Sequence, residues 1–214
     1  MASRPVFLPV LEKPYVKKID IEFTYYPGFS MTQKQKNILA IHEKFKDLYN
    51  GKLLEISSKS MTPDGVKLSA FKLLMTVPNS DDQQLVENVY QSGKVFEHGG
   101  PYVDLLYQTP LVAKRDERLR NSGRLIGYML GTQIFPSEPQ SLFYDYLYIK
   151  ALMENKELAD VLQYYDGFTD IEFNPNKSIN CQARAAARYV GLVKSKMLDQ
   201  VIISPEKFRE LFIV

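Results

Sequence analysis

The chain has 214 residues, of which 45% are hydrophobic and 24% charged, and its formal net charge is +2. A chain of this length and composition can bury a core of its own, so we expect one domain over residues 1–214, without a disordered or repetitive segment. The net charge is too small to indicate a nucleic-acid binder by itself. Nucleic-acid binding therefore has to be judged from where the basic residues lie in the chain.

Cysteine and histidine usage excludes two further classes of site. Cys181 is the single cysteine, which rules out an intramolecular disulfide and favours a reducing compartment. His42 and His98 lie far apart, with no cysteine or carboxylate at metal-ligand spacing, so we expect no structural metal. The amino-terminal segment lacks the pattern of a signal peptide, and no apolar run approaches the length of a membrane span. We therefore expect a cytoplasmic protein without a membrane partner.

The first elements have clear patterns. Hydrophobic and polar residues alternate over residues 18–25, which predicts a half-buried strand. A helix should follow, capped by Ser30 or Thr32, because apolar residues recur at helical spacing over residues 38–48. Asn50 and Gly51 should close it.

The next region is expected to be extended and then helical. Two apolar runs, residues 53–58 and 66–75, flank the turn-forming residues 62–65, which suggests a hairpin or two paired short strands. Residues 78–80 should then begin an amphipathic helix that stops at the glycine pair 99–100.

That helix carries three reactive polar residues. Glu87, Gln91 and Lys94 are spaced i, i+4, i+7 and would stack along one face. A carboxylate beside an amine, with an amide between them, can donate a proton, stabilise a cation or attack an electrophilic carbon. The alternative interpretation is a solvated ion-pair face with no catalytic role.

Helical patterns dominate the following region. We expect a helix over residues 111–121, a short extended segment over residues 126–135, and a long helix over residues 140–165 with a polar break at Asn155. The aromatic residues of the long helix either pack in the core or form a stacking surface for a base. Basic residues in this and a later segment could meet phosphates or merely keep helices soluble: Lys114, Arg115, Arg118, Arg120, Arg124, Arg184 and Arg188.

A second polar segment lies near the carboxyl terminus. Asp170 and Glu172 would point to the same side of an extended backbone, which suggests the wall of a site. Ser178 is expected to cap the next helix, where Asn180 and Arg184 could hold a phosphate or ribose hydroxyls. The alternative is a capped surface turn with solvated acids.

Several stretches together resemble the NADAR family, and specifically the branch that serves as antitoxin beside a DarT-type toxin that attaches ADP-ribose to guanine in DNA. The resemblance rests on Leu-Ser-Ala-Phe at 68–71, the segment 87–94, the small-residue and arginine segment 113–118, and the acidic motif 168–173. It spans nearly the whole chain. Two departures are Val86, where the family usually has Ser, and the absence of tryptophan, for which Phe143 or Tyr144 and Phe173 are the expected replacements.

The resemblance implies an α+β fold, mostly helical with a few short strands. It also implies hydrolysis of the N-glycosidic bond between ADP-ribose and the exocyclic nitrogen of guanine, without a cofactor or metal. The implied partners are ADP-ribosylated DNA as substrate, ADP-ribose as product and a DarT-type toxin. The implied catalytic residues are Glu87, Lys94, Asp170 and Glu172, and the implied substrate-binding residues are Ser69, Phe71, Tyr90, Gln91, Gly99, Gly100, Tyr102, Lys114, Arg118, Phe173, Asn180 and Arg184.

These residues fit the implied chemistry. Cleavage at the anomeric carbon develops oxocarbenium character and needs a proton on the departing nitrogen, so Glu87 is a reasonable acid and Asp170 or Glu172 can orient ribose hydroxyls. Lys94 either binds phosphate or pairs with Glu87 as a cation, or attacks the anomeric carbon as a neutral amine. Two alternatives stay open: an N-glycosidase acting on a small ribosylated metabolite, and an antitoxin that blocks the toxin without chemistry.

Overall fold

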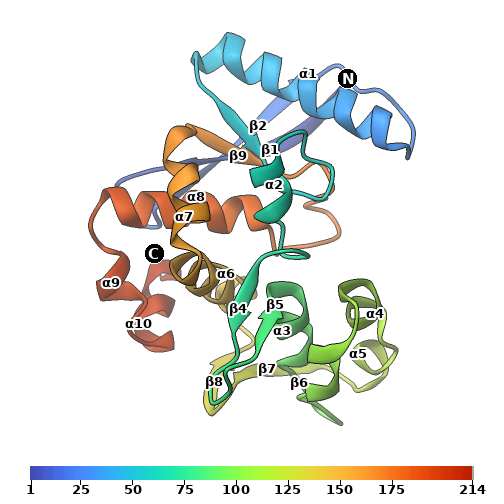
Figure 1. The fold of residues 1–214 in the computed structure, drawn as a ribbon, viewed down its shortest axis with the longest axis vertical. Coiled ribbons are helices and arrows are strands. Elements are labelled where there is room, and N and C mark those ends of the chain that lie inside the picture. The colour runs from blue at the N-terminus through green and yellow to red at the C-terminus, as the bar shows by residue number, and fades with distance from the viewer. Residues whose placement is uncertain (214) are drawn as a thin grey trace. The chain divides into compact units, whose positions relative to one another are not determined.

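The computed structural model describes residues 1–213 and has an α+β fold, with 44% helix and 20% strand (Figure 1). This confirms the predicted fold class. The chain divides into two compact units, each built from two stretches of sequence. Unit 1 contains Met1–Ser69 and Lys156–Asp199, and unit 2 contains Ala70–Asn155 and the residues from Gln200 onward. The single domain over residues 1–214 stays a prediction.

Unit 1 is organised by a four-stranded sheet in the order β2-β1-β9-β3. β1 and β2 form a regular antiparallel pair, whereas β3 runs parallel to β9. The predicted strand over residues 18–25 corresponds to β2 and is confirmed, while β1 was not predicted. The strands are β1 (Ala2–Pro9), β2 (Val16–Phe23), β3 (Leu53–Glu55) and β9 (Gly167–Thr169).

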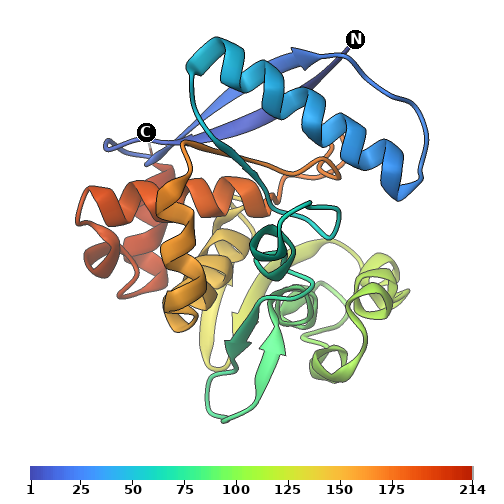
Figure 2. The same ribbon diagram turned by 45° about the horizontal axis from the view of Figure 1, so that its top comes forward.

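Helices α1 (Met31–Tyr49) and α8 (Gln182–Lys194) both pack on this sheet (Figure 2). The side chain of Ser30 caps α1 by accepting a hydrogen bond from the Gln33 amide, and Asn50 ends the helix with φ of 50°. The predicted helix and its caps are confirmed. Apolar side chains of α1 join those of β2 in a buried cluster because the helix presents one apolar face to the strands.

The segment between β3 and unit 2 differs from its prediction. Residues 62–65 do not turn a hairpin: Pro63–Lys67 forms the short helix α2, and the Thr62 hydroxyl caps it by accepting from the Gly65 amide. Thr-Pro is as favourable at the start of a helix as in a turn, so the local pattern did not distinguish the two. The remaining elements of unit 1 are α7 (Lys156–Asp160) and η2 (Val161–Tyr164), and the chain passes into unit 2 within α9 (Leu198–Val201).

Unit 2 contains a two-stranded ribbon, β4-β5, and a three-stranded antiparallel sheet in the order β6-β7-β8. The predicted extended segment 126–135 is confirmed as extended, but it forms two strands that turn at Gly131. The strands are β4 (Leu74–Thr76), β5 (Gln83–Leu85), β6 (Lys94–Phe96), β7 (Leu125–Leu130) and β8 (Gln133–Pro136).

Aromatic side chains of α6, β7 and β8 pack against one another in unit 2. The long predicted helix is confirmed over α6, which is buried over most of its length and ends before Asn155. Phe143 of α6 stacks on Tyr128 with ring centroids 4.6 Å apart and is fully buried, which supports the packing interpretation for the aromatics of α6, whereas Tyr164 is exposed. The predicted helix 111–121 is interrupted at Asp116. The helices are α3 (Val86–Ser92), η1 (Val103–Tyr107), α4 (Pro110–Arg115), α5 (Arg118–Asn121), α6 (Leu142–Glu154), α10 (Pro205–Arg209) and η3 (Glu210–Phe212).

Within residues 1–213, no helix combines the length and the apolar character needed to cross a membrane.

Candidate functional site

Helix α3 is much shorter than predicted. Residues 83–85 form β5, the helix begins at Val86, and it ends at Gly93. A Cβ atom on Gly93 would lie 2.5 Å from the Met129 carbonyl oxygen, and the Met129 amide donates to the Gly93 carbonyl at 2.7 Å. This close approach to β7 ends the helix, so Lys94 begins strand β6 instead of continuing α3.

The three reactive side chains nevertheless form one hydrogen-bonded chain. Gln91 Nε2 donates to Glu87 Oε1 at 2.8 Å, and Lys94 Nζ donates to Gln91 Oε1 at 2.7 Å. Glu87 and Gln91 are each only 4% exposed. The amide therefore links the acid to the amine inside the protein, which excludes a solvated surface face for these residues.

The environment of Lys94 favours its neutral form. Burial lowers the pKa of Lys94 to about 8, with the positive charge of Lys114 acting in the same direction and the negative charge of Glu87 opposing both. The Tyr90 ring, whose centroid lies 4.8 Å from Nζ, acts in the opposite direction, because a ring face attracts the ammonium. The neutral amine is therefore more accessible near neutral pH than in an exposed lysine.

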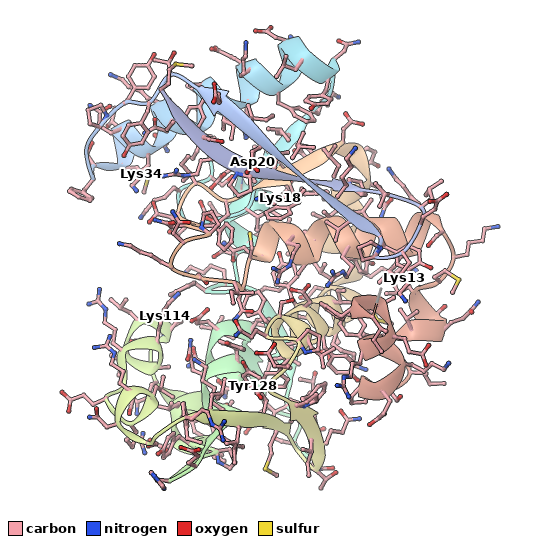
Figure 3. All side chains as sticks on the ribbon, turned by 180° about the vertical axis from the view of Figure 1, so that it is seen from behind. Lys13, Lys18, Asp20, Lys34, Lys114 and Tyr128 are labelled. Carbon is pink, nitrogen blue, oxygen red and sulfur yellow. The ribbon has the colours of Figure 1, made fainter. Side chains whose placement is uncertain are left out.

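Lys114 approaches the same acid from helix α4 (Figure 3). Its Nζ lies 3.6 Å from Glu87 Oε1 and 5.2 Å from the centroid of the Phe71 ring. Glu87 Oε1 therefore contacts both the Gln91 amide and the Lys114 ammonium. The predicted residues Phe71, Glu87, Tyr90, Gln91, Lys94 and Lys114 are brought together in unit 2, and we call them the Glu87 cluster.

The start of α3 is fixed by the backbone of the predicted motif 68–71. The Glu87 amide donates to the Ala70 carbonyl at 3.0 Å, and the Val86 amide donates to the Leu73 carbonyl at 3.0 Å. These bonds satisfy amides that a helix leaves without partners in its first turn. Ser69 is buried at the end of the first stretch of unit 1, where its amide donates to the Val66 carbonyl.

The glycine pair and Tyr102 support the junction between α3 and β6. The Phe96 amide donates to the Gly99 carbonyl at 2.8 Å, and the Tyr102 amide donates to the Ser92 carbonyl at 2.9 Å. Gly100 has φ of 82°, and a Cβ there would collide with the Lys94 carbonyl. These contacts give the segment a positioning role beside Lys94, and its binding of substrate stays a prediction.

Arg118 is engaged by two carboxylates. Its guanidinium donates to Asp104 Oδ2 at 2.6 Å and to Asp116 Oδ1 at 2.9 Å, and it lies 4.5 Å from the centroid of the Tyr102 ring. The hydrogen bonds from Arg118 lower the pKa of both aspartates and raise that of the guanidinium. A phosphate would have to compete with these carboxylates for Arg118.

Asp170 and Glu172 lie in unit 1, on a turn that follows β9. The extended backbone expected at Asp170 and Glu172 is wrong: β9 ends at Thr169, and Asp170 Oδ1 accepts a hydrogen bond from the Glu172 amide at 2.9 Å, which closes a turn. Gln182 Nε2 donates to Asp170 Oδ2 at 3.0 Å, and burial raises the pKa of Asp170 to about 6. Glu172 is exposed and forms an ion pair of 2.9 Å with Lys34 at the start of α1.

The predicted cap of α8 is also wrong. The helix begins at Gln182, and Ser178 Oγ donates to the Asn180 carbonyl at 3.2 Å instead of capping it. Arg184 donates to the Ile179 carbonyl at 2.6 Å and thereby stabilises the loop before the helix. Arg188 does not reach the surface: it is 4% exposed and donates to the Pro14 carbonyl.

Two further observations concern unit 1. Phe173 lies against Phe7, with ring centroids 6.3 Å apart, so it packs on the sheet. Glu55 was missed: it is 1% exposed, and its Oε1 accepts hydrogen bonds from Ser57 Oγ at 2.6 Å and from the Ile171 amide at 2.9 Å. An acid inside an apolar run was the only sequence signal for it. Across residues 1–213, no three His, Cys, Asp or Glu side chains are grouped as metal ligands.

Unit 2 of this α+β fold therefore holds an acid, an amide and an amine in one hydrogen-bonded chain, which are groups that acid and nucleophilic chemistry would require. The model of a family described as DarT1-associated NADAR antitoxin matches residues 2–214, and the chain belongs to this family. No curated protein matches the chain. Family membership confirms the resemblance seen in the sequence and indicates a functional pairing with a DarT toxin.

Proposed function

We propose that the chain is an ADP-ribosyl glycohydrolase that removes ADP-ribose from guanine in DNA and so reverses the modification made by the toxin. The observation that carries this proposal is the hydrogen-bonded chain from buried Glu87 through buried Gln91 to the half-buried Lys94. It supplies a proton donor and a nucleophile that are held apart by one amide. The family match supports an antitoxin role, and the substrate and the reaction are inferred from this chemistry.

In the proposed first step, protonated Glu87 donates its proton to the exocyclic nitrogen of guanine as the bond to the anomeric carbon breaks. A neutral leaving group departs more easily, and the sugar acquires oxocarbenium character. Gln91 holds the acid in place through its Nε2 and the amine through its Oε1. The amide thus fixes both reacting groups relative to each other.

In the second step, the neutral amine of Lys94 attacks the anomeric carbon and forms a carbon–nitrogen bond. The ammonium that results loses a proton to the Glu87 carboxylate, and opening of the sugar ring gives an imine with a protonated ring oxygen. Water then adds to the imine carbon, the bond to Nζ breaks, and ADP-ribose leaves with the free amine restored. The lowered pKa of Lys94 supports this role, because only the neutral amine is a nucleophile.

For unit 1 we propose a binding role. Asp170 and Glu172 would accept hydrogen bonds from ribose hydroxyls, since carboxylate oxygens are strong acceptors. Asn180, in the loop before α8, and Arg184, in the first turn of α8, would bind polar groups of ADP-ribose. Asp170→Asn should therefore weaken binding of free ADP-ribose, which calorimetry measures directly.

The proposal is tested with an oligonucleotide ADP-ribosylated on guanine, beside one modified on thymine, followed by mass analysis of the DNA. We expect loss of the guanine adduct and release of ADP-ribose, with activity reduced at least about a hundredfold in Glu87→Gln. Glu97→Gln is the matched control, because Glu97 is an accessible carboxylate of the same unit that pairs with Arg124. No release by the unmodified protein would contradict the proposal.

The same variant separates the alternatives. A protein that blocks the toxin without chemistry should still protect cells after Glu87→Gln, whereas a glycohydrolase should lose protection while staying folded. A glycosidase for a small ribosylated metabolite would leave both oligonucleotides intact and cleave the metabolite.

A further inference from the structure

Glu55 is a buried acid whose two carboxyl oxygens differ in their hydrogen bonding. It belongs to β3, between the apolar Leu54 and Ile56, and is 1% exposed. Ser57 Oγ and the Ile171 amide both donate to Oε1, whereas Oε2 is buried and has no hydrogen-bond partner among residues 1–213. An ionised carboxylate would need partners on both oxygens at such a depth, because an unpaired buried charge is costly.

The charges around Glu55 also disfavour ionisation. The charged side chains that act on it, Asp170 and Glu172, are both acidic. Two cations of unit 1 are engaged elsewhere, since Lys34 pairs with Glu172 and Arg184 donates to the Ile179 carbonyl. Burial, followed by the charge of Asp170, raises the pKa of Glu55 well above its ordinary value.

We propose that Glu55 is a neutral carboxylic acid in the folded protein and that it positions the Asp170 turn through the Ile171 amide. Its carbonyl oxygen is Oε1, which accepts both recorded hydrogen bonds, and Oε2 carries the proton. The turn is tied from two sides, by Glu55 at Ile171 and by Gln182 at Asp170. If Glu55 is neutral, Asp170 is the carboxylate of this pair that carries the negative charge. Asp170 is the group proposed above to bind ribose, so the positioning role of Glu55 rests on the proposed function.

The protonation state is tested by comparing the unfolding equilibrium of the wild type with that of Glu55→Gln between pH 5 and pH 8. An amide has the shape of the neutral acid, can accept at the same oxygen and does not titrate. In the wild type, the unfolded chain loses the Glu55 proton near pH 4.5, whereas the folded chain keeps it to higher pH. Stability from the neutral acid is therefore complete below that pH and is lost as pH rises through the folded pKa.

We expect the unfolding constant of the wild type, relative to Glu55→Gln, to rise by up to about tenfold per pH unit within that window. Asp170 is present in both proteins and cancels from the ratio to first order. A ratio that falls with pH, or stays flat, would mean that folded Glu55 is ionised and would overturn the inference. Failure of Glu55→Gln to fold would also overturn it, because the amide is the closest replacement for a neutral acid.

The positioning role is tested by calorimetric binding of ADP-ribose to the wild type, Glu55→Gln and Glu55→Leu. We expect the glutamine variant to bind within about twofold of the wild type and the leucine variant, which cannot accept from Ile171, at least about tenfold more weakly. Equal binding by all three proteins would contradict the positioning role. If the wild type itself does not bind ADP-ribose, the proposed function fails, whereas the pH test of Glu55 stands independently.

Discussion

The protonation state of Lys94 distinguishes its two proposed roles. If the neutral amine attacks the anomeric carbon, the yield of a Lys94 adduct with free ADP-ribose, trapped by a hydride reductant, should rise with pH up to about 8, where Lys94 titrates, and then level off. Free ADP-ribose is the right probe because its reaction needs no proton from Glu87 for a departing guanine. If Lys94 acts only as a cation, no adduct should form at any pH. Trapping with a hydride reductant should give an adduct on the wild type, and its complete absence from active protein would count against the covalent role.

The charge of Lys114 should set the pH at which the reaction of Lys94 rises. Its positive charge lowers the pKa of Lys94, so Lys114→Met should move the rising limb to higher pH, whereas Lys114→Arg, which keeps the charge, should leave it nearly in place. Lys114 also contacts Glu87 at 3.6 Å, so the methionine variant should lose rate at all pH values as well. A limb that does not move in the methionine variant would show that Lys114 has no influence on Lys94.

At the scale of residues, much of the Glu87 cluster could be predicted. The i, i+4, i+7 spacing brought Glu87, Gln91 and Lys94 together as expected, although Lys94 lies on a strand. The reason is that the chain turns at Gly93, which keeps the Lys94 side chain within reach of the Gln91 amide. Glu55 could not be found in this way, because its importance depends on a contact with Ile171, which is distant in the sequence.

Among the elements, the junction between α3 and β6 controls where Lys94 points. Gly93→Ala should push its new methyl group against the Met129 carbonyl, which lies 2.5 Å from the Cβ position. We expect a loss of about 1–3 kcal/mol in the free energy of unfolding, which is typical of an overpacked site. The yield of hydride-trapped adduct at Lys94 should also fall, because the side chain no longer points at the substrate. Denaturant titration and trapping yield measure the two effects. Ser92→Ala, which adds no atom, is the control, and normal trapping in Gly93→Ala would contradict this role of the junction.

Elements with long, regular patterns were predicted well. The helix after Ser30 and the helix that ends at Asn155 have apolar residues at helical spacing over many turns, and the structure confirms both. The errors fall on short segments. Pro63 was taken for a turn residue although it begins α2, and residues 83–85 were assigned to a helix although they pair with β4. In such segments tertiary contacts outweigh local propensity.

The distribution of charge over the molecule decides how DNA would be bound. The net charge is only +2, and several of the basic residues expected to meet phosphates are paired: Lys114 with Glu87, Arg118 with Asp104 and Asp116, and Arg124 with Glu97. Arg115 and Arg120 are exposed, and in the described part of the chain neither side chain forms an ion pair. We therefore expect phosphate contacts mainly from Arg115 and Arg120.

This expectation is tested by the salt dependence of binding to the modified oligonucleotide. Each direct phosphate contact adds about 0.7 to the slope of log affinity against log salt for a single strand. Arg115→Ala and Arg120→Ala should each reduce the slope by about that amount. Arg118→Ala should leave it nearly unchanged, because that guanidinium is already bound by two carboxylates. An equal reduction by Arg118→Ala would mean that DNA displaces Asp104 and Asp116 from the arginine. A wild-type slope near zero would instead indicate a small ribosylated substrate, since such a molecule releases few counterions on binding.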